Sequence, residues 1–543
     1  MTTMTRMLIA TLATAPAAWA QIATPVTYTK DIAPLVNRHC LECHRPGMGT
    51  PFNFLTYDDV KKRARLIEEV TGNGFMPPWK AERGHTALRD ERGLSPDEIA
   101  TIAAWVAQGR NEGNPADLPV PPVFPEGWRL GIPDIILEMP EAYPVPADGP
   151  DIYHNFVMQI PELPEGTWVK GIEFQPSAPS VVHHSLFDLD RSGVALRMDA
   201  MDAGPGFGGM EQRFADERIG GYAVGALPTW LPEGVAIAIP DDALMVIETH
   251  FHPSGKAESE KSRMGLFLTK EPPTRELVAL PIPAMFGMTT GLEVPAGEAN
   301  FVVEHSYTVP CDVEAIKINP HAHYICKEIE AVAKFPDNRE QVLIRVLDWD
   351  FAWQEQYIFE EPVLLPRGTE IQLRFVYDNS AANPRNPFQP PQRIGWGPQS
   401  TDEMAGCGLS VIAVRPEDTP LIRQAINDYR IREFETVDVE ILRPILIAEM
   451  NKRFDKDGDG TIGWREQLGM IQYWRATQAD APDTPAMQVQ QVMVRRVFGD
   501  YIEQRRQYLL WGTAVVMAVA GATITLIARR WKRRHSGTAT RPA

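Results

Sequence analysis

The chain has 543 residues, a formal net charge of −18 at pH 7, 44% hydrophobic residues and 23% charged residues. This length predicts several domains, and the hydrophobic content is sufficient for packed cores. The negative charge argues against nucleic acid as a partner and against broad adsorption to anionic lipid.

Residues 1–20 have the pattern of a secretory signal peptide. Arg6 supplies a positive charge, Met7 to Ala13 is a short and mostly apolar run, and Ala18-Trp19-Ala20 matches a small-residue cleavage site. We expect the exported chain to begin near Gln21, and we expect it to enter an oxidising compartment.

Residues 28–112 carry the pattern of a small all-helical domain. Apolar spacing predicts helices over residues 57–71 and 95–108, and the second begins with a capping sequence at Ser95. Cys40-Leu41-Glu42-Cys43-His44 is the attachment pattern of a c-type haem, in which the thiols bond to the haem and the histidine binds iron. The alternative, a zinc or redox C-x-x-C pair, has no second cysteine pair nearby. We therefore expect a cytochrome c-like domain.

A sixth haem ligand is expected further along the chain. Met76, in the sequence GFMPPW, is the preferred candidate, because prolines favour an extended loop there and a thioether raises the haem potential. Met48 is the competing candidate, but it lies very close in sequence to His44. A packing role for Met76 also stays open. The expected haem-binding residues are thus Cys40, Cys43, His44 and Met76.

A proline-rich linker, residues 113–127, follows the helical region. Beyond it, short runs of Val, Ile, Phe and Tyr recur between Pro, Gly and Asp turns, and helical periodicity is almost absent. This pattern is typical of antiparallel β-sandwiches. The length fits two of them in tandem, over residues 128–270 and 276–418.

Three histidine pairs and one methionine stand out in the β-rich region. They are His183 and His184 in VVHHS, His250 and His252 in ETHFHP, His321 and His323 in NPHAHY, and Met404 in STDEM. Imidazole binds both Cu(I) and Cu(II), and a thioether favours Cu(I). These donors predict two copper sites with three ligands each.

Strand geometry limits how these side chains can share an ion. His321 and His323 lie two residues apart and so point to one face of a strand. His183 and His184 would point to opposite faces of a regular strand, so a bulge or a strand end is needed to aim both at one metal. His252 shares a face with His250 and competes with it as a ligand.

These motifs resemble the copper type II, ascorbate-dependent monooxygenases, the family of peptidylglycine α-hydroxylating and dopamine β-monooxygenases. The resemblance covers about residues 128–418. It rests on VVHHSLF, on IETHFHP (close to the family's EVHYHNP), on a histidine-x-histidine pair, and on TDEM (close to SDEM). It implies two tandem, jelly-roll-like β-sandwiches with one copper ion on each.

The resemblance also divides the ligands between the two coppers. It implies that the first, electron-transferring copper is held by His183, His184 and His250, with His252 as the alternative to His250. It implies that the second copper, where O2 and substrate meet, is held by the catalytic residues His321, His323 and Met404.

The implied activity is that of a copper-dependent monooxygenase, which hydroxylates a C–H bond of a small substrate with O2 and releases water. The reaction needs two electrons, and we expect the fused c-type haem to supply them in place of ascorbate. A periplasmic or quinol-linked donor would reduce the haem. The alternatives are a copper and haem electron-transfer or copper-binding protein that hydroxylates nothing, and a copper oxidase.

The chain departs from the peptidylglycine enzymes at the substrate. Those enzymes anchor a substrate carboxylate with an arginine two residues before the histidine pair, and with an asparagine and a tyrosine after the methionine. Here the corresponding positions hold Asn319, Gly406 and Gly408. We therefore do not expect a peptide carboxylate as the substrate.

Several cysteines and histidines fall outside these motifs. Cys311, Cys326 and Cys407 are an odd number of thiols in an oxidising compartment, for which one disulfide and one free thiol is the simplest arrangement, with the pairing open. His154 and His305 have no motif partner, and we expect them to be structural or to contact a metal ligand.

Residues 435–478 contain a calcium-loop motif. Residues 455–466 match the EF-hand loop, with Gly460 at the sharp turn and helices expected over Val439–Phe454 and Trp464–Trp474. The expected calcium ligands are Asp455, Asp457, Asp459, Thr461 and Glu466. The alternative is a solvated acidic turn. A single loop favours a structural calcium ion over a cooperative sensor.

Residues 508–528 form an uncharged stretch long enough to span a bilayer. The basic tail that follows, residues 529–543, places the C-terminus in the cytoplasm by the positive-inside rule. The expected localisation is therefore the bacterial inner membrane, with a single span and the bulk of the chain in the periplasm.

Overall fold

The computed structural model describes residues 25–46, 50–124, 127–209, 218–224 and 226–455, together with a few single residues between 458 and 496. The predicted signal peptide, the predicted span at 508–528, the basic tail and Met48 lie outside these residues. The chain divides into two compact units. The first contains residues up to 79 and residues 91–124, and the second contains residues 80–90 and the chain from 125 onward.

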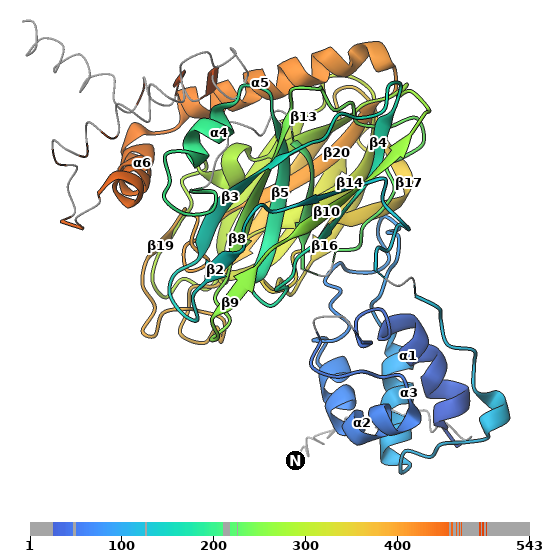
Figure 1. The fold of residues 1–543 in the computed structure, drawn as a ribbon. Helices are drawn as coiled ribbons and strands as arrows, with labels where there is room; N and C mark the ends of the chain where they lie inside the picture. Colours follow the sequence, from blue (N-terminus) through green and yellow to red (C-terminus); the bar gives the residue numbers. More distant parts are fainter. Residues whose placement is uncertain are drawn as a thin grey trace, which may run out of the picture. The chain divides into compact units, whose positions relative to one another are not determined.

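The first unit is built from short helices (Figure 1). In chain order they are the π-helix η1 (Tyr28–Ile32), α1 (Ala33–His39), α2 (Tyr57–Gly72), α3 (Pro96–Ala107) and the 3-10 helix η2 (Pro115–Asp117). α2 and α3 each begin with a capping box, Thr56 with Asp59 and Ser95 with Glu98. These reciprocal bonds satisfy backbone N–H groups that a helix start leaves without partners, which explains why both helices could be predicted from the sequence.

The core of the first unit lies where helical spacing places apolar side chains on one stripe. On α2 this stripe buries Val60, Ala64 and Ile67, and on α3 it buries Ile102 and Trp105. All five belong to one cluster of buried residues. Burying a large apolar side chain stabilises the fold by about 1.5–3 kcal/mol, so this cluster holds the unit together.

In the second unit, residues 128–270 form three antiparallel sheets, with strand orders β6-β3-β8-β5-β7, β1-β10-β4 and β2-β9. The strands are β1 (Ile135–Glu138), β2 (Tyr143–Val145), β3 (Ile152–Gln159), β4 (Trp168–Gln175), β5 (Val182–Asp190), β6 (Phe207–Gly208), β7 (Arg218–Ala223), β8 (Leu244–Phe251), β9 (Glu258–Glu260) and β10 (Arg263–Thr269). One short helix, α4 (Val194–Asp199), follows β5.

Residues 276–418 also form three sheets, with orders β11-β20-β14-β17, β13-β18-β15-β16 and β12-β19. The strands are β11 (Leu277–Ile282), β12 (Glu293–Val294), β13 (Phe301–Thr308), β14 (Val313–His321), β15 (Cys326–Lys334), β16 (Glu340–Val346), β17 (Tyr357–Leu365), β18 (Glu370–Tyr377), β19 (Ile394–Gly395) and β20 (Gly406–Ala413). The 3-10 helix η4 (Ala284–Gly287) lies between β11 and β12, and the 3-10 helix η5 (Pro416–Asp418), α5 (Thr419–Thr436) and α6 (Val439–Phe454) follow β20.

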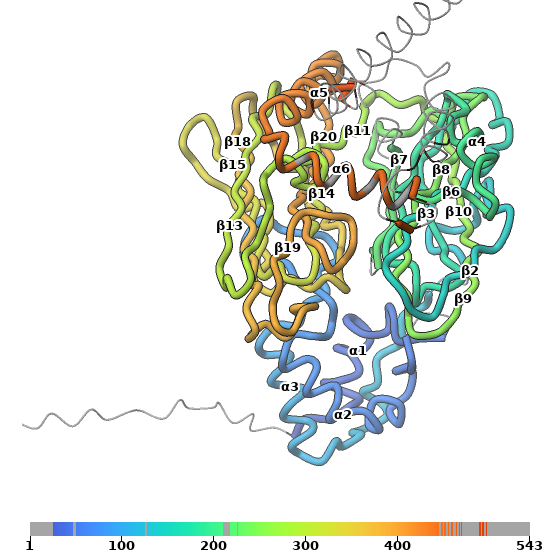
Figure 2. Tube along the Cα trace, turned by 90° about the vertical axis from the view of Figure 1, so that its left-hand side faces the viewer, coloured from blue at the N-terminus to red at the C-terminus, as the bar shows by residue number. Residues whose placement is uncertain are grey.

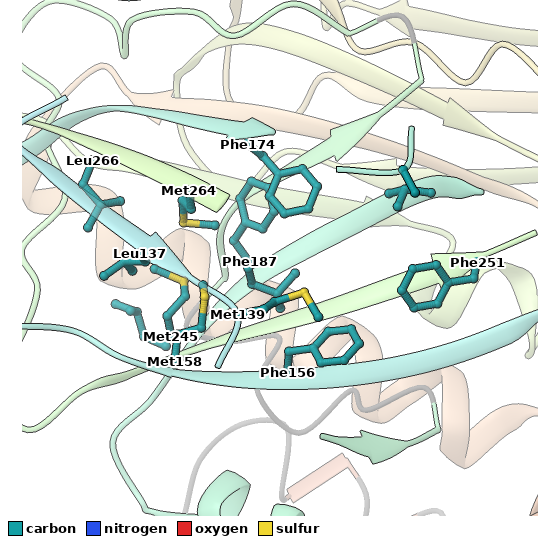
Figure 3. Close-up of a cluster of buried hydrophobic side chains, with 14 of the residues drawn as sticks. Leu137, Met139, Phe156, Met158, Phe174, Phe187, Met245, Phe251, Met264 and Leu266 are labelled. Carbon is teal, nitrogen blue, oxygen red and sulfur yellow. The ribbon is translucent and has the colours of Figure 1, made fainter. Parts of the chain in front are cut away.

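The strands of these two regions are seen as two groups in Figure 2, with β3, β8 and β10 in one and β13, β15 and β18 in the other. We call them the first and second β-regions. The core of the first β-region lies between its five-stranded and three-stranded sheets (Figure 3). Phe156 on β3 and Met245 on β8 face Met264 and Leu266 on β10 in this core. The central strand β8 is buried along its whole length.

A segment from within the predicted cytochrome domain belongs to the second unit. Residues 80–90 run beside two strands of the second β-region, with isolated antiparallel bridges from Ala81 to Val346 and from Leu88 to Phe359. Lys80 Nζ lies 2.9 Å from Asp348 Oδ2. The first unit is therefore made of two pieces of chain.

The predicted fold class is wrong. We expected a small all-α cytochrome c domain, two tandem antiparallel β-sandwiches, an α-helical EF-hand segment and a transmembrane helix. The described residues are mainly antiparallel β-sheet, with six short α-helices. No all-α cytochrome domain is apparent in the described part of residues 28–112, because α1 has only 7 residues and residues 73–95 are irregular except for two isolated bridges.

The predicted localisation, a single-pass protein of the bacterial inner membrane, is also contradicted. Among the residues that the structure describes, no helix combines the length and the apolar composition needed to cross a membrane. The segment on which the prediction rested, residues 508–528, lies outside the described residues.

The expected disulfide is not present. Cys311, Cys326 and Cys407 are separate, buried free thiols. Strand register explains part of this result, because Cys407 on β20 lies opposite Ile282 on β11 and Pro320 on β14, while Cys326 on β15 lies opposite Tyr377 on β18. The two cysteines therefore lie on different sheets.

Candidate metal centre

The histidines of the first β-region are brought together by two neighbouring strands. β5 pairs with β8, and His184 lies directly opposite His250. The register shifts between Val182 and His184, so His183 is an extra residue in β5. A bulge of this kind re-aims the side chain that a regular strand would point to the other face. The need for a bulge or a strand end at this pair, inferred from the sequence, is confirmed.

The three side chains converge on one point. One potential ligand atom from each of His183, His184 and His250 lies within 4.8 Å of the other two. His250 Nδ1 is 3.1 Å from His184 Nε2. Two nitrogens that each lie about 2.0–2.1 Å from one metal ion are separated by a comparable distance. The cluster therefore has the spacing of a three-histidine metal site.

The buried carboxylate of Asp151 lies beside this cluster and contacts two histidines. Asp151 Oδ2 lies 3.4 Å from His250 Nε2, and Asp151 Oδ1 lies 2.7 Å from His252 Nδ1. Burial opposes ionisation of Asp151, but the close His250 ring and the hydrogen bond with His252 hold the pKa of Asp151 well below its ordinary value. His252 is not part of the three-histidine cluster, and its side chain is 45% exposed. The geometry thus separates His250 from its competitor.

The second β-region holds its ligand candidates in a different way. His321 ends β14 and lies opposite Gly406, the first residue of β20. One oxygen of the buried Glu403, Oε2, accepts hydrogen bonds from the backbone N–H of His323 at 2.9 Å and of Met404 at 3.1 Å. The other oxygen accepts from Ile325 N at 2.8 Å. Glu403 therefore fastens the histidine segment to the methionine segment.

His323 and Met404 are both buried. His323 Nδ1 lies 3.3 Å from the carbonyl oxygen of Asp402, and His323 Nε2 has no hydrogen-bond partner among the described residues. The rings of His321 and His323 have centroids 5.4 Å apart. A buried nitrogen without a partner is costly unless something binds it, so His323 Nε2 is a candidate ligand atom.

The two histidine sets are neighbours. The ring centroids of His184 and His321 are 6.1 Å apart. Phe351 lies between the sets, with its ring stacked on His183 at 4.3 Å and edge-on to His323 at 5.4 Å. Neither the adjacency nor the part played by Phe351 was expected from the sequence.

The electrostatic environment favours neutral imidazoles. Burial is the largest cause in each case: it lowers the pKa of His183 to about 3 and that of His321 to about 4. It also holds the pKa values of His184 and His323 well below the ordinary value. Metal ions bind deprotonated imidazole nitrogen, so histidines kept neutral by burial are suited to holding a metal ion.

In the first unit, the C-x-x-C-H residues lie on the turn that follows α1. His44 donates from Nδ1 to the carbonyl oxygen of Phe52 at 3.1 Å, and its ring stacks on Phe52 and Phe54. Burial lowers the pKa of His44. Its Nε2 is left as the acceptor nitrogen, as an iron ligand requires. Met76 follows α2 and is partly buried, and its N–H bonds to the carbonyl of Val70.

The predicted calcium loop is described only in part. Asp457 and Thr461 lie outside the described residues. Asp455 Oδ1 accepts hydrogen bonds from the backbone N–H of Gly458 at 2.8 Å and of Asp459 at 3.2 Å. The helix expected over Val439–Phe454 is present as α6 and ends directly before the turn at Asp455.

The structure identifies supporting residues that the sequence did not reveal. Asp151, Glu403, Phe351 and Gln354 all contact ligand candidates or their backbones. Only Glu403 carried a signal, because it lies beside Met404 in TDEM. Of the two histidines without a motif partner, His154 lies with its Nε2 2.8 Å from the carbonyl oxygen of Pro205, in keeping with a structural role.

Comparisons with known proteins add little to this description. No protein-family profile and no curated protein matches the chain. Among solved structures, it is weakly similar to the VP2 subviral particle of infectious bursal disease virus, with 10% identity over 54% of this chain and 76% of that chain and a TM-score of 0.18. A particle of the Gx strain of the same virus gives 8% identity, 52% and 74% coverage and a TM-score of 0.16. Similarity at this level carries no argument about fold or function.

Proposed function

We propose that this protein is a copper-dependent monooxygenase that hydroxylates a C–H bond of a small substrate with O2. The observation that carries the proposal is the convergence of His183, His184 and His250 on one point, directly beside His321. The motif resemblance to the copper type II monooxygenases supports the same assignment. Bound copper would supply one-electron redox chemistry and O2 activation.

The proposal gives each ligand set a distinct part. His183, His184 and His250 form an all-imidazole set suited to both copper oxidation states. His321 and His323 combine with the soft thioether of Met404, which favours the reduced ion. The protein's own contribution is to keep the imidazoles neutral by burial and to hold Met404 next to the histidine segment through Glu403.

The surroundings of His321 support a substrate that is uncharged near the reacting carbon. Phe286 packs against His321, with ring centroids 5.1 Å apart. A Cβ at Gly406 would lie 2.6 Å from the Phe286 ring, so the glycine makes room for the aromatic side chain. Phe286 has a φ of 52°, a left-handed conformation that is costly for a non-glycine residue. An apolar wall thus replaces a polar anchor at this position.

We further propose that a covalent c-type haem at Cys40, Cys43 and His44 supplies the electrons, with Met76 as the sixth ligand. The hydrogen bond from His44 Nδ1 to Phe52 supports it, because it orients the imidazole as haem proteins require. One calcium ion in residues 455–466 is proposed on the loop motif and on the bonds to Asp455. Removing calcium with a chelator should then lower the thermal midpoint of unfolding.

Metal and haem analysis of the purified protein is the first test. We expect two copper ions and one haem per chain, followed by incorporation of one atom of oxygen-18 from O2 into a product across a panel of small apolar substrates. Copper and haem without any oxygen incorporation would instead favour an electron-transfer or copper-binding protein. Peroxide formation without incorporation would favour a copper oxidase.

Met404→Ile tests the division of labour within the site. Isoleucine is apolar and similar in volume, but it offers no sulfur donor. We expect oxygen incorporation to be lost, while the haem spectrum and the copper at His183, His184 and His250 are retained. If substrate-dependent oxygen uptake survives this change, the monooxygenase proposal is wrong.

A further inference from the structure

The connection between β16 and β17 touches both histidine sets. We call residues Asp348–Gln354, with the sequence DWDFAWQ, the bridging turn. It leads from the sheet β13-β18-β15-β16 to the sheet β11-β20-β14-β17. A backbone bond from Trp353 N to Asp350 O at 2.9 Å closes it. Lys80 and Arg385 both pair with Asp348, at 2.9 and 2.8 Å. The turn is therefore held in place at its start.

The main-chain carbonyl of Phe351, in this turn, lies within hydrogen-bond distance of two side-chain nitrogens. The oxygen of Phe351 lies 3.0 Å from His183 Nε2 and 3.2 Å from Gln354 Nε2. A carbonyl oxygen can only accept hydrogen bonds, so both nitrogens must donate to it. His183 therefore carries its proton on Nε2, and Nδ1 keeps its lone pair. That Nδ1 is buried and has no hydrogen-bond partner among the described residues.

The same carbonyl fixes the orientation of the Gln354 amide, and through it the tautomer of His321 in the second histidine set. Because the nitrogen of this amide faces the Phe351 carbonyl, its oxygen must be the atom that faces His321 Nδ1, with which it forms a short hydrogen bond. An amide oxygen accepts, so His321 carries its proton on Nδ1. The lone pair of His321 is then on Nε2.

We propose that the carbonyl of Phe351, acting through Gln354, sets which nitrogen each histidine set offers to a metal ion: Nδ1 from His183 and Nε2 from His321. Both side chains of the turn are buried, Phe351 at 4% and Gln354 at 8% exposed, so water does not compete for these bonds. Phe351 and Gln354 are positioning residues, since they act through the histidines. The part of the inference that concerns copper rests on the function proposed above.

The test is carried out first without metal. Nitrogen-15 spectroscopy of the histidine-labelled, metal-free protein reports the protonated nitrogen of each imidazole. We expect His183 to be protonated on Nε2 and His321 on Nδ1. Gln354→Leu removes the amide and should leave His321 in a mixture of tautomers. Gln354→Glu should keep the Nδ1 proton, because the carbonyl only fixes which end of the amide faces His321, and a carboxylate has an acceptor oxygen at both ends. A wild-type His321 protonated on Nε2 would overturn the inference.

Copper titration supplies a second readout. We expect Gln354→Leu to weaken binding at His321, His323 and Met404 by about 10–100-fold, as for other residues that orient a metal ligand. Binding at the first set should change by less than about 3-fold, since His183 keeps its bond to the main chain. The matched control is Gln356→Leu, two residues on, where the glutamine pairs with Lys317 instead.

The two proposals fail separately. If the tautomers are as inferred but the wild-type protein binds no copper, the proposed function fails and the positioning role stands. If copper binds to both sets but Gln354→Leu and Gln356→Leu weaken it equally, the positioning role fails and the proposed function stands.

Discussion

The first and second β-regions bring their candidate metal ligands together by different means. In the first, strand pairing itself brings the candidate ligands together, because His184 and His250 are cross-strand partners and a bulge adds His183. In the second, a buried carboxylate joins two loop segments, because Glu403 accepts from the backbone N–H groups of His323 and Met404. We therefore expect the cluster formed by strand register to tolerate loss of a supporting side chain better than the one tied by a single carboxylate.

Glu403→Ala should have the largest effect. The substitution leaves several buried N–H groups without an acceptor, which we expect to cost about 3–5 kcal/mol of unfolding free energy, measured by chemical denaturation. The copper site at His321 should be lost as well. Glu260→Ala is the matched control, because Glu260 is fully buried in the first β-region and bonds to Ser177 and Ser262. It should destabilise the fold but spare both copper sites.

His184→Ala should come next, with a copper stoichiometry reduced from two to one and a loss at the first site of about 100-fold or more, since one of three ligands is removed. His252→Ala is the control, one residue beyond the end of β8, and it should keep both coppers. If His252→Ala abolishes the first copper and His250→Ala does not, the assignment of His250 as the ligand is wrong.

Asp151→Asn should have an intermediate effect that reaches both regions. Asp151 Oδ1 faces His252, and Asp151 Oδ2 accepts from the backbone N–H of Ser400 at 2.7 Å, in the segment that leads to Met404. Asparagine keeps the size but loses the charge, so we expect about 1–3 kcal/mol less stability. Unfolding curves at two copper concentrations would measure it. An unchanged midpoint in both would show that Asp151 does not join the two regions.

Phe351→Leu should have the smallest effect. The main-chain carbonyl stays, so the tautomer of His183 should not change. The ring stacking is lost, at about 0.5–1.5 kcal/mol, together with the packing of the buried volume that leucine leaves unfilled. Thermal unfolding and the nitrogen-15 spectrum together measure this. A changed His183 tautomer would show that the aromatic ring, and not the carbonyl, orients the imidazole.

The parts of this arrangement that could be predicted are those written in local sequence. Ser95 and Glu98 predict a helix start, and adjacent histidines in a strand need a bulge or a strand end to face one point, which the structure provides as a bulge at His183. The fold class could not be predicted correctly, because Gly and Pro between residues 73 and 95 break the helical pattern in ways that composition does not resolve. The predicted localisation rested on residues 508–528, which lie outside the described residues, and no described helix is long and apolar enough to cross a membrane.

The supporting residues could not be predicted for a different reason. Gln354 lies 33 positions from His321, and Asp151 lies 101 positions from His252. Neither stands in a motif, and each acquires its role only when strands from distant parts of the chain pair. A glutamine or aspartate with no periodic neighbours is indistinguishable in sequence from a solvated one, so the ligands were visible and the residues that orient them were not.

Residues 80–90 determine how a truncated form of the protein should behave on expression. Their bridges to Val346 and Phe359 lie on β16 and β17, which are the outermost strands of their sheets. A shortened chain that starts after the linker at residue 127 would lack this cover and expose backbone groups on both sheet margins. Such margins invite strand addition from other molecules, so this fragment should self-associate on expression unless residues 80–90 are added back as a peptide.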